Sequence, residues 1–355
     1  MKKRARLFGW LIPLIIGLSC PLPILPCSTL VLFQKGFPVF ATNYDNAFAP
    51  GQIFINKRGV RKTGWEAGTK GRVAAWTSRY GSVTIACAGY QLAWGGMNEA
   101  GLAFSTMFLK ETKVPPPDER ASLIGTFWWQ YALDTCATVE DLVKAAEQIR
   151  ISSTVDHYLV CDRTGACAVV ECLNGRLMIR TGKDLTVPVL TNDPYQKCLD
   201  RWKTRSVSSP LPYNSFNRFS RLADGVSGFQ AGGSAATVEK AFDLLAGVAN
   251  DLITRWSFVC DTENGVFHFR TYGNPKVRFI DLKKLDFDCA RPVLMLDAHA
   301  DLEDDVSGAF REYSHDEVYA HLVKALQHFS PGVPEETVRK ILALFESFTC
   351  GPAGK

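Results

Sequence analysis

Strand-like and helix-like runs occur in separate blocks along this chain, and this separation restricts the fold more than any other feature. The first half contains short runs rich in β-branched or aromatic residues and bounded by glycine or polar turns, at 28–33, 37–42, 73–77, 83–88 and 102–109. Helical segments follow at 121–134 and 139–149, and Thr138 with Asp141 forms a capping-box pattern before the second. Such blocks predict an α+β fold in which helices cover antiparallel sheets.

The second half repeats the pattern and then changes character. Strands are expected at 158–161, 167–172, 176–180, 255–260 and 266–271, with a helix at 236–250. From Asp297 the chain is acidic, and helices are expected at 316–329, after the capping pair Ser314 and Glu317, and at 335–348. The last helix carries an apolar stripe that we expect to pack on the domain's own surface. We therefore divide the chain into a domain at 27–296 and, at 297–355, an acidic linker with a C-terminal helical extension.

The N-terminus has the composition of an export signal. Basic residues within 1–6 precede an apolar stretch at 7–18, which is shorter than the ~20 residues that span a membrane. Residues 1–19 are predicted to be a signal peptide, which places the protein outside the cell or in the periplasm. Pro26 disfavours cleavage directly before Cys27, so residues 20–26 are expected to form a short propeptide that is removed in a second step. Lipidation of Cys20 is an alternative, since Leu18-Ser19-Cys20 loosely resembles a lipoprotein site.

Charge and cysteine content exclude several functional classes. The formal charge of +4 comes from four basic residues in the leader, so residues 27–355 are neutral overall. Neutrality gives no support to a nucleic acid or an anionic membrane as a partner. The eleven cysteines contain no CxxC pair, so a zinc site has little support, and any disulfide pairing in an exported protein cannot be read from their spacing. No metal or other cofactor is expected.

Cys27 is the candidate nucleophile. It directly precedes the strand-like run 28–33, which turns at Gln34-Lys35-Gly36. If the preceding residues are removed, Cys27 supplies a thiol and also an α-amine with a reference pKa of about 7.7 to 8.0. An amine in that range can take and return the thiol proton near neutral pH. Self-cleavage, by attack of the Cys27 thiol on the Pro26 carbonyl, would expose that amine.

Several motifs occur in an order that resembles a known family. They are Cys27-Ser28-Thr29, Thr42-Asn43-Tyr44-Asp45, Gly96-Met97-Asn98-Glu99-Ala100-Gly101-Leu102, Asp162-Arg163-Thr164-Gly165 with Val169-Val170-Glu171, Leu190-Thr191-Asn192-Asp193-Pro194, Asn217-Arg218-Phe219-Ser220-Arg221 and Thr271-Tyr272. Together they resemble the choloylglycine hydrolases and penicillin V acylases, which are linear amide C–N hydrolases. The resemblance covers about 27–285. It implies an αββα sandwich, the N-terminal-nucleophile hydrolase fold, and a homo-oligomer, in the family a homotetramer.

The resemblance also implies a role for each matched residue. Cys27 would form a thioester with the acyl group, and Asp45 would hold the α-amine. Asn192 would donate to the oxyanion together with the backbone N–H of Phe108, although Asn192 taken alone is as consistent with an Asx-turn before Pro194. Arg218 would stabilise negative charge at the thiolate, whereas its neighbour Arg221 is expected to be exposed or structural.

Two positions depart from the family pattern. Most relatives carry arginine where Thr42 stands, so either Arg218 alone supplies the charge or Lys57 or Arg58 moves in. Relatives place Asn or Tyr where Phe108 stands, which a backbone donor tolerates. The aromatic residues Trp94, Phe104, Trp128 and, with them, Phe108 and Trp129 are candidates to bind an apolar acyl group, with core packing as the alternative for each.

Other interpretations remain open at this stage. Asp297-Ala298-His299-Ala300-Asp301 resembles a manganese-binding segment, but a second aspartate-rich segment is lacking and an acidic linker is favoured. Without arginine at Thr42, the chain could be a catalytically silent relative that acts as a binding protein. A Cys/His protease is a more distant alternative, because no ligand spacing or papain-like context surrounds His157, His268, His315, His321 or His328. The substrate stays open among penicillin V, a conjugated bile acid, an N-acyl homoserine lactone and other small amides.

Overall fold

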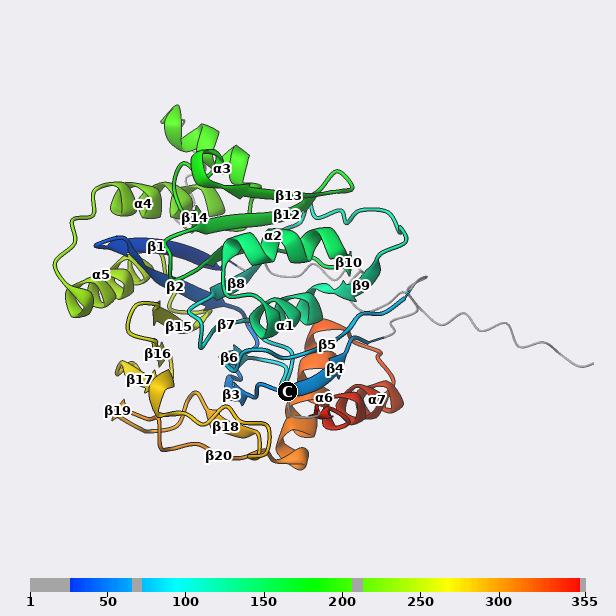
Figure 1. The fold of residues 1–355 in the computed structure, drawn as a ribbon. Helices are drawn as coiled ribbons and strands as arrows, with labels where there is room; N and C mark the ends of the chain where they lie inside the picture. Colours follow the sequence, from blue (N-terminus) through cyan, green and yellow to red (C-terminus); the bar gives the residue numbers. More distant parts are fainter. Residues whose placement is uncertain (1–25, 66–71, 206–212, 352–355) are drawn as a thin grey trace, which may run out of the picture.

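Two large sheets pack face to face, and helices cover both outer faces (Figure 1). A computed structural model describes residues 26–65, 72–205 and 213–351. The predicted signal peptide, Cys20 and all of the propeptide except Pro26 lie outside these residues. The arrangement confirms the predicted αββα sandwich.

The first sheet has seven strands and contains the N-terminal hairpin. All its pairs are antiparallel except β17 with β19. Its spatial order is β14 (Val189–Leu190), β1 (Ser28–Gln34), β2 (Phe37–Asp45), β15 (Thr254–Asp261), β16 (Val266–Thr271), β17 (Arg278–Asp281) and β19 (Asp304–Asp305).

The second sheet has nine strands, and its pairs are antiparallel throughout. Its spatial order is β13 (Arg176–Thr181), β12 (Cys167–Leu173), β11 (Asp156–Cys161), β8 (Ala103–Phe108), β7 (Gly95–Asn98), β6 (Ser82–Ala86), β3 (Gln52–Asn56), β18 (Leu294–Asp297) and β20 (Arg311–Glu312). Two small sheets lie beside it, β9 (Ala121–Ile124) with β10 (Ile149–Ser153), and β21 (Thr349–Cys350) with β4 (Val60–Thr63) and β5 (Ala75–Thr77).

Helices form the two outer layers. The helices α4 (Ser215–Ser227) and α5 (Ser234–Ala246) pack on the seven-stranded sheet, and α3 (Tyr195–Lys203) packs against α4. The opposite layer contains α1 (Gly125–Thr135), α2 (Val139–Gln148), α6 (His315–Phe329) and α7 (Glu335–Glu346), whose apolar residues share one core with the outer face of the nine-stranded sheet. A second core fills the space between the two sheets and extends under α4 and α5.

The C-terminal region is integrated into this sandwich. The apolar stripe of α7 is buried against the domain, as predicted, at Val338, Ile341, Leu342 and Phe345. The acidic segment after Asp297 adds edge strands to both large sheets through β19 and β20, so it belongs to the sheets and does not run free between them and α6. Cys289 and Cys350 form a disulfide, and the other described cysteines are free and buried.

Several predicted elements need correction. Residues 121–124 form β9 rather than the start of a helix, because they pair with β10 and Ser122 also bridges to Val73. The Thr138 capping box is present. The one predicted at Ser314 is absent, because the Glu317 carboxylate pairs with Arg311 instead.

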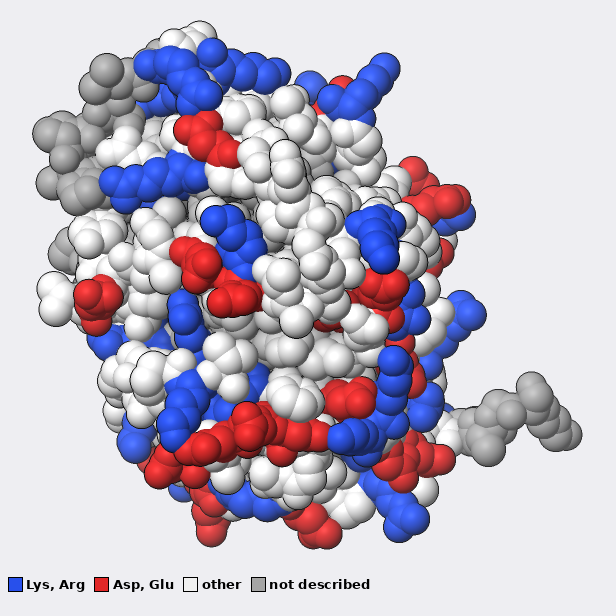
Figure 2. Space-filling model, turned by 90° about the vertical axis from the view of Figure 1, so that its left-hand side faces the viewer, with Lys and Arg blue, Asp and Glu red and all other residues white. Residues whose placement is uncertain are grey.

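The outer surface shows no uniform charge on the face drawn in Figure 2, where acidic and basic side chains are interspersed. Within the described residues, no helix has the length and apolarity needed to cross a membrane.

Candidate active site

The β1–β2 hairpin brings Cys27 and Asp45 together. Its two-residue turn contains Lys35 and Gly36, both with positive φ (49° and 92°), a conformation that favours tight hairpins. The register pairs Ser28 with Asn43, so the end of β2 lies beside the residue that precedes β1. The Cys27 thiol donates to the Asp45 carbonyl oxygen at 3.9 Å. Cys27 is fully buried, and burial raises the pKa of its thiol.

The carboxyl group of Asp45 is buried without a partner. Neither of its side-chain oxygens has a hydrogen bond to any described residue. Burial raises the pKa of Asp45 to about 7, and the nearby Thr254 hydroxyl and Arg218 guanidinium oppose this rise only in part. Because a buried polar group without a partner is costly, such a group in a native structure calls for an explanation. A hydrogen-bond donor that forms next to Asp45 after the chain has folded would provide such an explanation.

Arg218 connects the remaining groups of the site. It lies on α4, whose first turn is capped by the Asn214 side chain, and it is fully buried. Its Nη1 donates to the carbonyl oxygens of Pro26 at 2.8 Å and Cys27 at 2.5 Å, and to the Ser28 hydroxyl at 2.7 Å. This guanidinium therefore fixes the carbonyl groups on both sides of the Cys27 backbone.

Asn192 and Phe108 lie on the other side of Arg218. The Asn192 side-chain oxygen accepts from Arg218 Nη2 at 2.8 Å, and its Nδ2 donates to the Phe108 carbonyl at 2.9 Å. Within an extended strand the N–H and C=O of one residue point to the same edge. The Phe108 N–H thus points to the side on which Asn192 lies, while the next amide, Leu109 N–H, donates to Val155 O on the opposite side. The structure brings together Cys27, Asp45, Asn192, Arg218 and the Phe108 backbone.

Thr42 stands where most relatives carry arginine, and its hydroxyl group belongs to a network of hydroxyl groups. Its Oγ1 lies 2.8 Å from Thr29 Oγ1 and 3.1 Å from Ser105 Oγ, and it donates to Ser28 O at 3.1 Å. These residues come from β1, β2 and β8, so the network joins the two sheets beside the nucleophile. Neutral hydroxyl groups therefore fill this space.

The alternative cations lie elsewhere. Lys57 donates to the Asp286 carbonyl at 2.7 Å, and Arg58 pairs with Glu99 at 2.7 Å. Neither side chain is hydrogen-bonded or ion-paired to Cys27 in these contacts. Arg221 is exposed and its Nη1 lies 3.5 Å from Gly247 O, as expected for the neighbour of Arg218. Within the described site, Arg218 is the cation that contacts the Cys27 backbone.

Glu171 supports the Asn192 loop, a role that sequence reasoning did not assign. Its Oε1 accepts from the backbone N–H of Tyr195 at 2.9 Å, at the start of α3, and lies 3.1 Å from His157 Nδ1. Tyr195 follows Asn192 by three residues, so this contact fixes where the loop ends. The only signal in the sequence was that Glu171 belongs to one of the matched motifs.

An apolar cavity of about 180 Å³ opens beside the site. Phe108 and Trp94 line it, and the Trp94 ring contacts Tyr44, the neighbour of Asp45, at 4.7 Å between centroids. Trp94 is thus placed where an acyl group could contact it. Phe104 and Trp128 are fully buried in the core behind the sheet, where Phe104 stacks on Trp129 and the Trp128 indole donates to Ile149 O, so the structure places them away from the cavity.

The manganese interpretation of the segment 297–301 finds no support. His299 Nε2 lies 2.9 Å from Ala49 O, and Asp297 accepts from the backbone N–H of His299. In the part of the chain that the structure describes, no three His, Cys, Asp or Glu side chains are grouped so as to hold a metal ion.

Sequence comparisons relate this chain to known amide hydrolases. The profile of the linear amide C–N hydrolases, choloylglycine hydrolase family, matches residues 27–224. A penicillin V acylase from Pectobacterium atrosepticum is 28% identical over 261 residues, which cover 60% of this chain and 69% of that protein.

Solved structures share the fold. A penicillin V acylase from Agrobacterium tumefaciens superposes with a TM-score of 0.70 at 24% identity, covering 81% of this chain and 98% of that one. A conjugated bile acid hydrolase from Clostridium perfringens gives a TM-score of 0.61 at 17% identity, covering 78% and 98%.

Proposed function

We propose that this chain, which belongs to the choloylglycine hydrolase family of linear amide C–N hydrolases, cleaves its amide substrate with Cys27 as an N-terminal nucleophile. The observation that carries the proposal is the polar cluster around Cys27. The unpartnered Asp45 carboxyl group lies at the end of the strand beside Cys27, and Arg218 binds the carbonyl of the peptide bond that must be cut. Both features match what removal of residues 1–26 requires.

The first step is self-cleavage. The Cys27 sulfur attacks the Pro26 carbonyl carbon, the C–N bond to Cys27 breaks, and the thiol proton goes to the departing Cys27 nitrogen. Arg218 donates to the oxygen on which negative charge develops, at 2.8 Å in the uncleaved chain. Water then hydrolyses the thioester, which restores the thiol and leaves Pro26 with a free carboxylate.

The new α-amine completes the site. It forms beside Asp45, whose carboxyl group otherwise has no described partner. An amine close to a carboxylate gives that buried group the hydrogen-bond donor it lacks, and Asp45 in turn holds the amine near the sulfur.

Turnover then follows two steps of acyl transfer. The α-amine takes the thiol proton as sulfur adds to the substrate carbonyl, and gives it to the departing amine as the C–N bond breaks. Water, deprotonated by the same amine, hydrolyses the thioester and releases the acid. The Asn192 side chain and the Phe108 N–H stabilise the oxyanion, a contribution of about 3 kcal/mol for such a donor. Asn192 must exchange its present bond to Phe108 O for this role.

The relatives suggest substrates to test. One is named a penicillin V acylase and another a conjugated bile acid hydrolase, so amides of small acids with an apolar acyl group are the first choice. We also propose export through the N-terminal signal and assembly into a homo-oligomer, which cell fractionation and light scattering of the purified protein would test.

A direct experiment combines intact mass with turnover. Wild-type protein should begin at Cys27 and release amine from at least one of penicillin V, a glycine-conjugated bile acid and an N-acyl homoserine lactone. Cys27→Ala should retain Pro26 and release none. Full activity in protein that still carries Pro26 would refute the mechanism, because no α-amine would then be available.

A further inference from the structure

The apolar cavity beside Phe108 has one wall that lies outside the region matched by the family. Leu322, Leu326 and Phe329 of α6 and Ile341 of α7 line it, whereas the family match ends at residue 224. The C-terminal helices therefore complete a cavity whose other walls come from the sandwich.

The two ends of the cavity differ in chemical character. Its lining is mostly apolar, and its one carboxyl group, Asp156, lies with Thr106 near the Phe108 end, where β8 pairs with β11. At the other end α6 contributes Leu322, Leu326 and Phe329 beside the hydroxyl of Ser330. The Phe108 carbonyl is in turn bonded to Asn192. An amide held by the oxyanion donors at this end would direct its acyl group toward α6.

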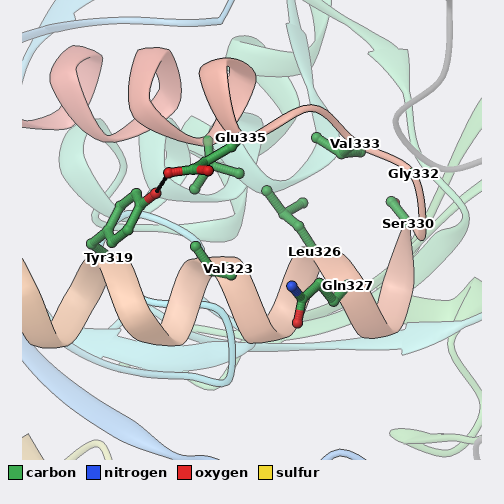
Figure 3. A pocket seen from close by; sticks show the side chains of 9 residues that line it. Tyr319, Val323, Leu326, Gln327, Ser330, Gly332, Val333 and Glu335 are labelled. Atoms are coloured by element: carbon green, nitrogen blue, oxygen red, sulfur yellow. Dashed lines mark hydrogen bonds between the residues drawn. The ribbon is translucent and has the colours of Figure 1, made fainter.

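A second hollow of about 340 Å³ adjoins this cavity, between α6 and α7. Leu326 and Ser330 line both spaces. Figure 3 shows Leu326 and Val323 pointing from α6 into this second hollow, whose far end is closed by the hydrogen bond from Tyr319 to Glu335 at 2.7 Å. Leu326 is thus the apolar side chain that lines both the cavity beside Phe108 and the outer hollow.

The inner volume limits what can bind. A dry apolar cavity of about 150 Å³ holds one benzene molecule. The inner cavity of about 180 Å³ therefore accommodates a single aromatic ring or a short alkyl chain, and a longer chain would have to pass Leu326.

We propose that Leu326 sets the upper limit of acyl length in this enzyme, by closing the inner cavity against the hollow between α6 and α7. The inference rests on the proposed function for its catalytic readout. Within the limit, each additional buried methylene group should improve kcat/KM about fourfold, and beyond it the gain should stop.

The test uses the mature enzyme and a series of saturated 4-nitroanilides from butanoyl to tetradecanoyl, with a constant leaving group. Leu326→Ala joins the two spaces and should move the optimum at least two carbons longer, raising kcat/KM for the longest acyl groups at least tenfold relative to hexanoyl. Leu326→Phe should move it shorter. Val323→Ala is the matched control, because Val323 lines the outer hollow alone and its truncation should leave the optimum unchanged.

Calorimetric binding of the corresponding free carboxylates separates the two proposals. A shift toward longer carboxylates in Leu326→Ala, with no anilide cleaved by wild type, would count against the proposed function and support the role of Leu326. Anilide hydrolysis with coincident length profiles in wild type and both Leu326 variants would overturn the role of Leu326 and leave the function intact. An equal shift in Val323→Ala would also overturn it.

Discussion

Two buried aspartates differ in whether their carboxyl groups have hydrogen-bond or ion-pair partners. Asp134 on α1 lies 2.9 Å from Lys62 Nζ and accepts from the Trp76 indole at 2.7 Å and the Gln130 amide at 2.8 Å. Asp45 on β2 has no described partner for either oxygen. Burial raises the pKa of both groups. Burial alone therefore does not distinguish the two carboxyl groups, whereas the hydrogen bonds and ion pair of Asp134 do.

The difference separates a structural role from a chemical one. Asp134 ties α1 to β4 and β5 with a satisfied ion pair, and the cost of its burial is offset within the folded chain. Asp45 is placed by the hairpin beside Cys27, and the partner that we propose for it is the amine that cleavage of the chain would create. The following experiments are arranged to break or sharpen this contrast.

The largest effect is expected on stability at Asp134. Asp134→Ala leaves the Lys62 ammonium group buried and unpaired, so the free energy of unfolding should fall by about 3–5 kcal/mol. Urea unfolding measures this loss, and turnover per folded molecule should not change. A loss below about 1 kcal/mol would remove the structural half of the contrast.

The next effect is expected on turnover at Asp45. Asp45→Asn should lower kcat about a hundredfold, since the α-amine loses the group that holds it, with little change in the free energy of unfolding. Steady-state hydrolysis together with urea unfolding tests both halves. Less than a tenfold loss of kcat would contradict the role of Asp45.

A separate loss of turnover is expected at Asn192. Asn192→Ala should lower kcat at least tenfold, because an oxyanion donor is removed, and steady-state hydrolysis measures this loss.

A third effect concerns pH in uncleaved protein. In Cys27→Ala the native Asp45 keeps its proton up to about pH 7, whereas an unfolded aspartate loses it near pH ~3.9. The native state binds more protons across this window, so stability should be full below it, fall by about 2 kcal/mol between pH 5 and 7, and level off above pH 7. Thermal unfolding at constant ionic strength measures the decline. The double variant Cys27→Ala with Asp45→Asn is the control, and it should lack this part of the pH dependence.

The smallest effect is expected at Arg221. It lies on α4 less than one turn after Arg218, but it is exposed, so Arg221→Ala should change the free energy of unfolding by less than about 0.5 kcal/mol and turnover by less than twofold. Kinetics and urea unfolding of this variant provide the baseline for Arg218→Ala. A large loss of turnover or stability in Arg221→Ala would contradict the role of Arg218. It would show that any arginine substitution on this part of α4 is harmful, with or without contact to Cys27 and Asn192.

Local features made the hairpin, and the proximity of Cys27 and Asp45 within it, predictable. The Lys35-Gly36 turn fixes the register of β1 and β2, and the register places Asp45 next to Cys27. The helix α4 was not predicted as an element, although Arg218 within it was, because the motif identifies the residue without showing its conformation.

The sequence did not reveal how deeply each aromatic side chain is buried between the layers of the fold. Phe104 and Phe108 point to the same face of β8, but Phe108 lies at the strand end and lines the cavity, whereas Phe104 lies further along the strand, under α1. The four residues of β9 resembled the start of α1 in sequence. Their strand pairing depends on β10 and Val73, which lie more than twenty residues away along the chain. Such contacts depend on tertiary structure and leave no periodic signal.

The bond between Cys289 and Cys350 encloses α6 and α7 in a covalent ring, with a sequence separation of 61 residues between its ends. A single proteolytic nick in the connection at 330–334 would release neither helix, because α6 stays joined through the main chain and α7 through the sulfur atoms. Loss of α7 from the enzyme therefore requires two events, backbone cleavage and reduction. In an oxidising environment the C-terminal wall of the cavity is thus protected against partial digestion.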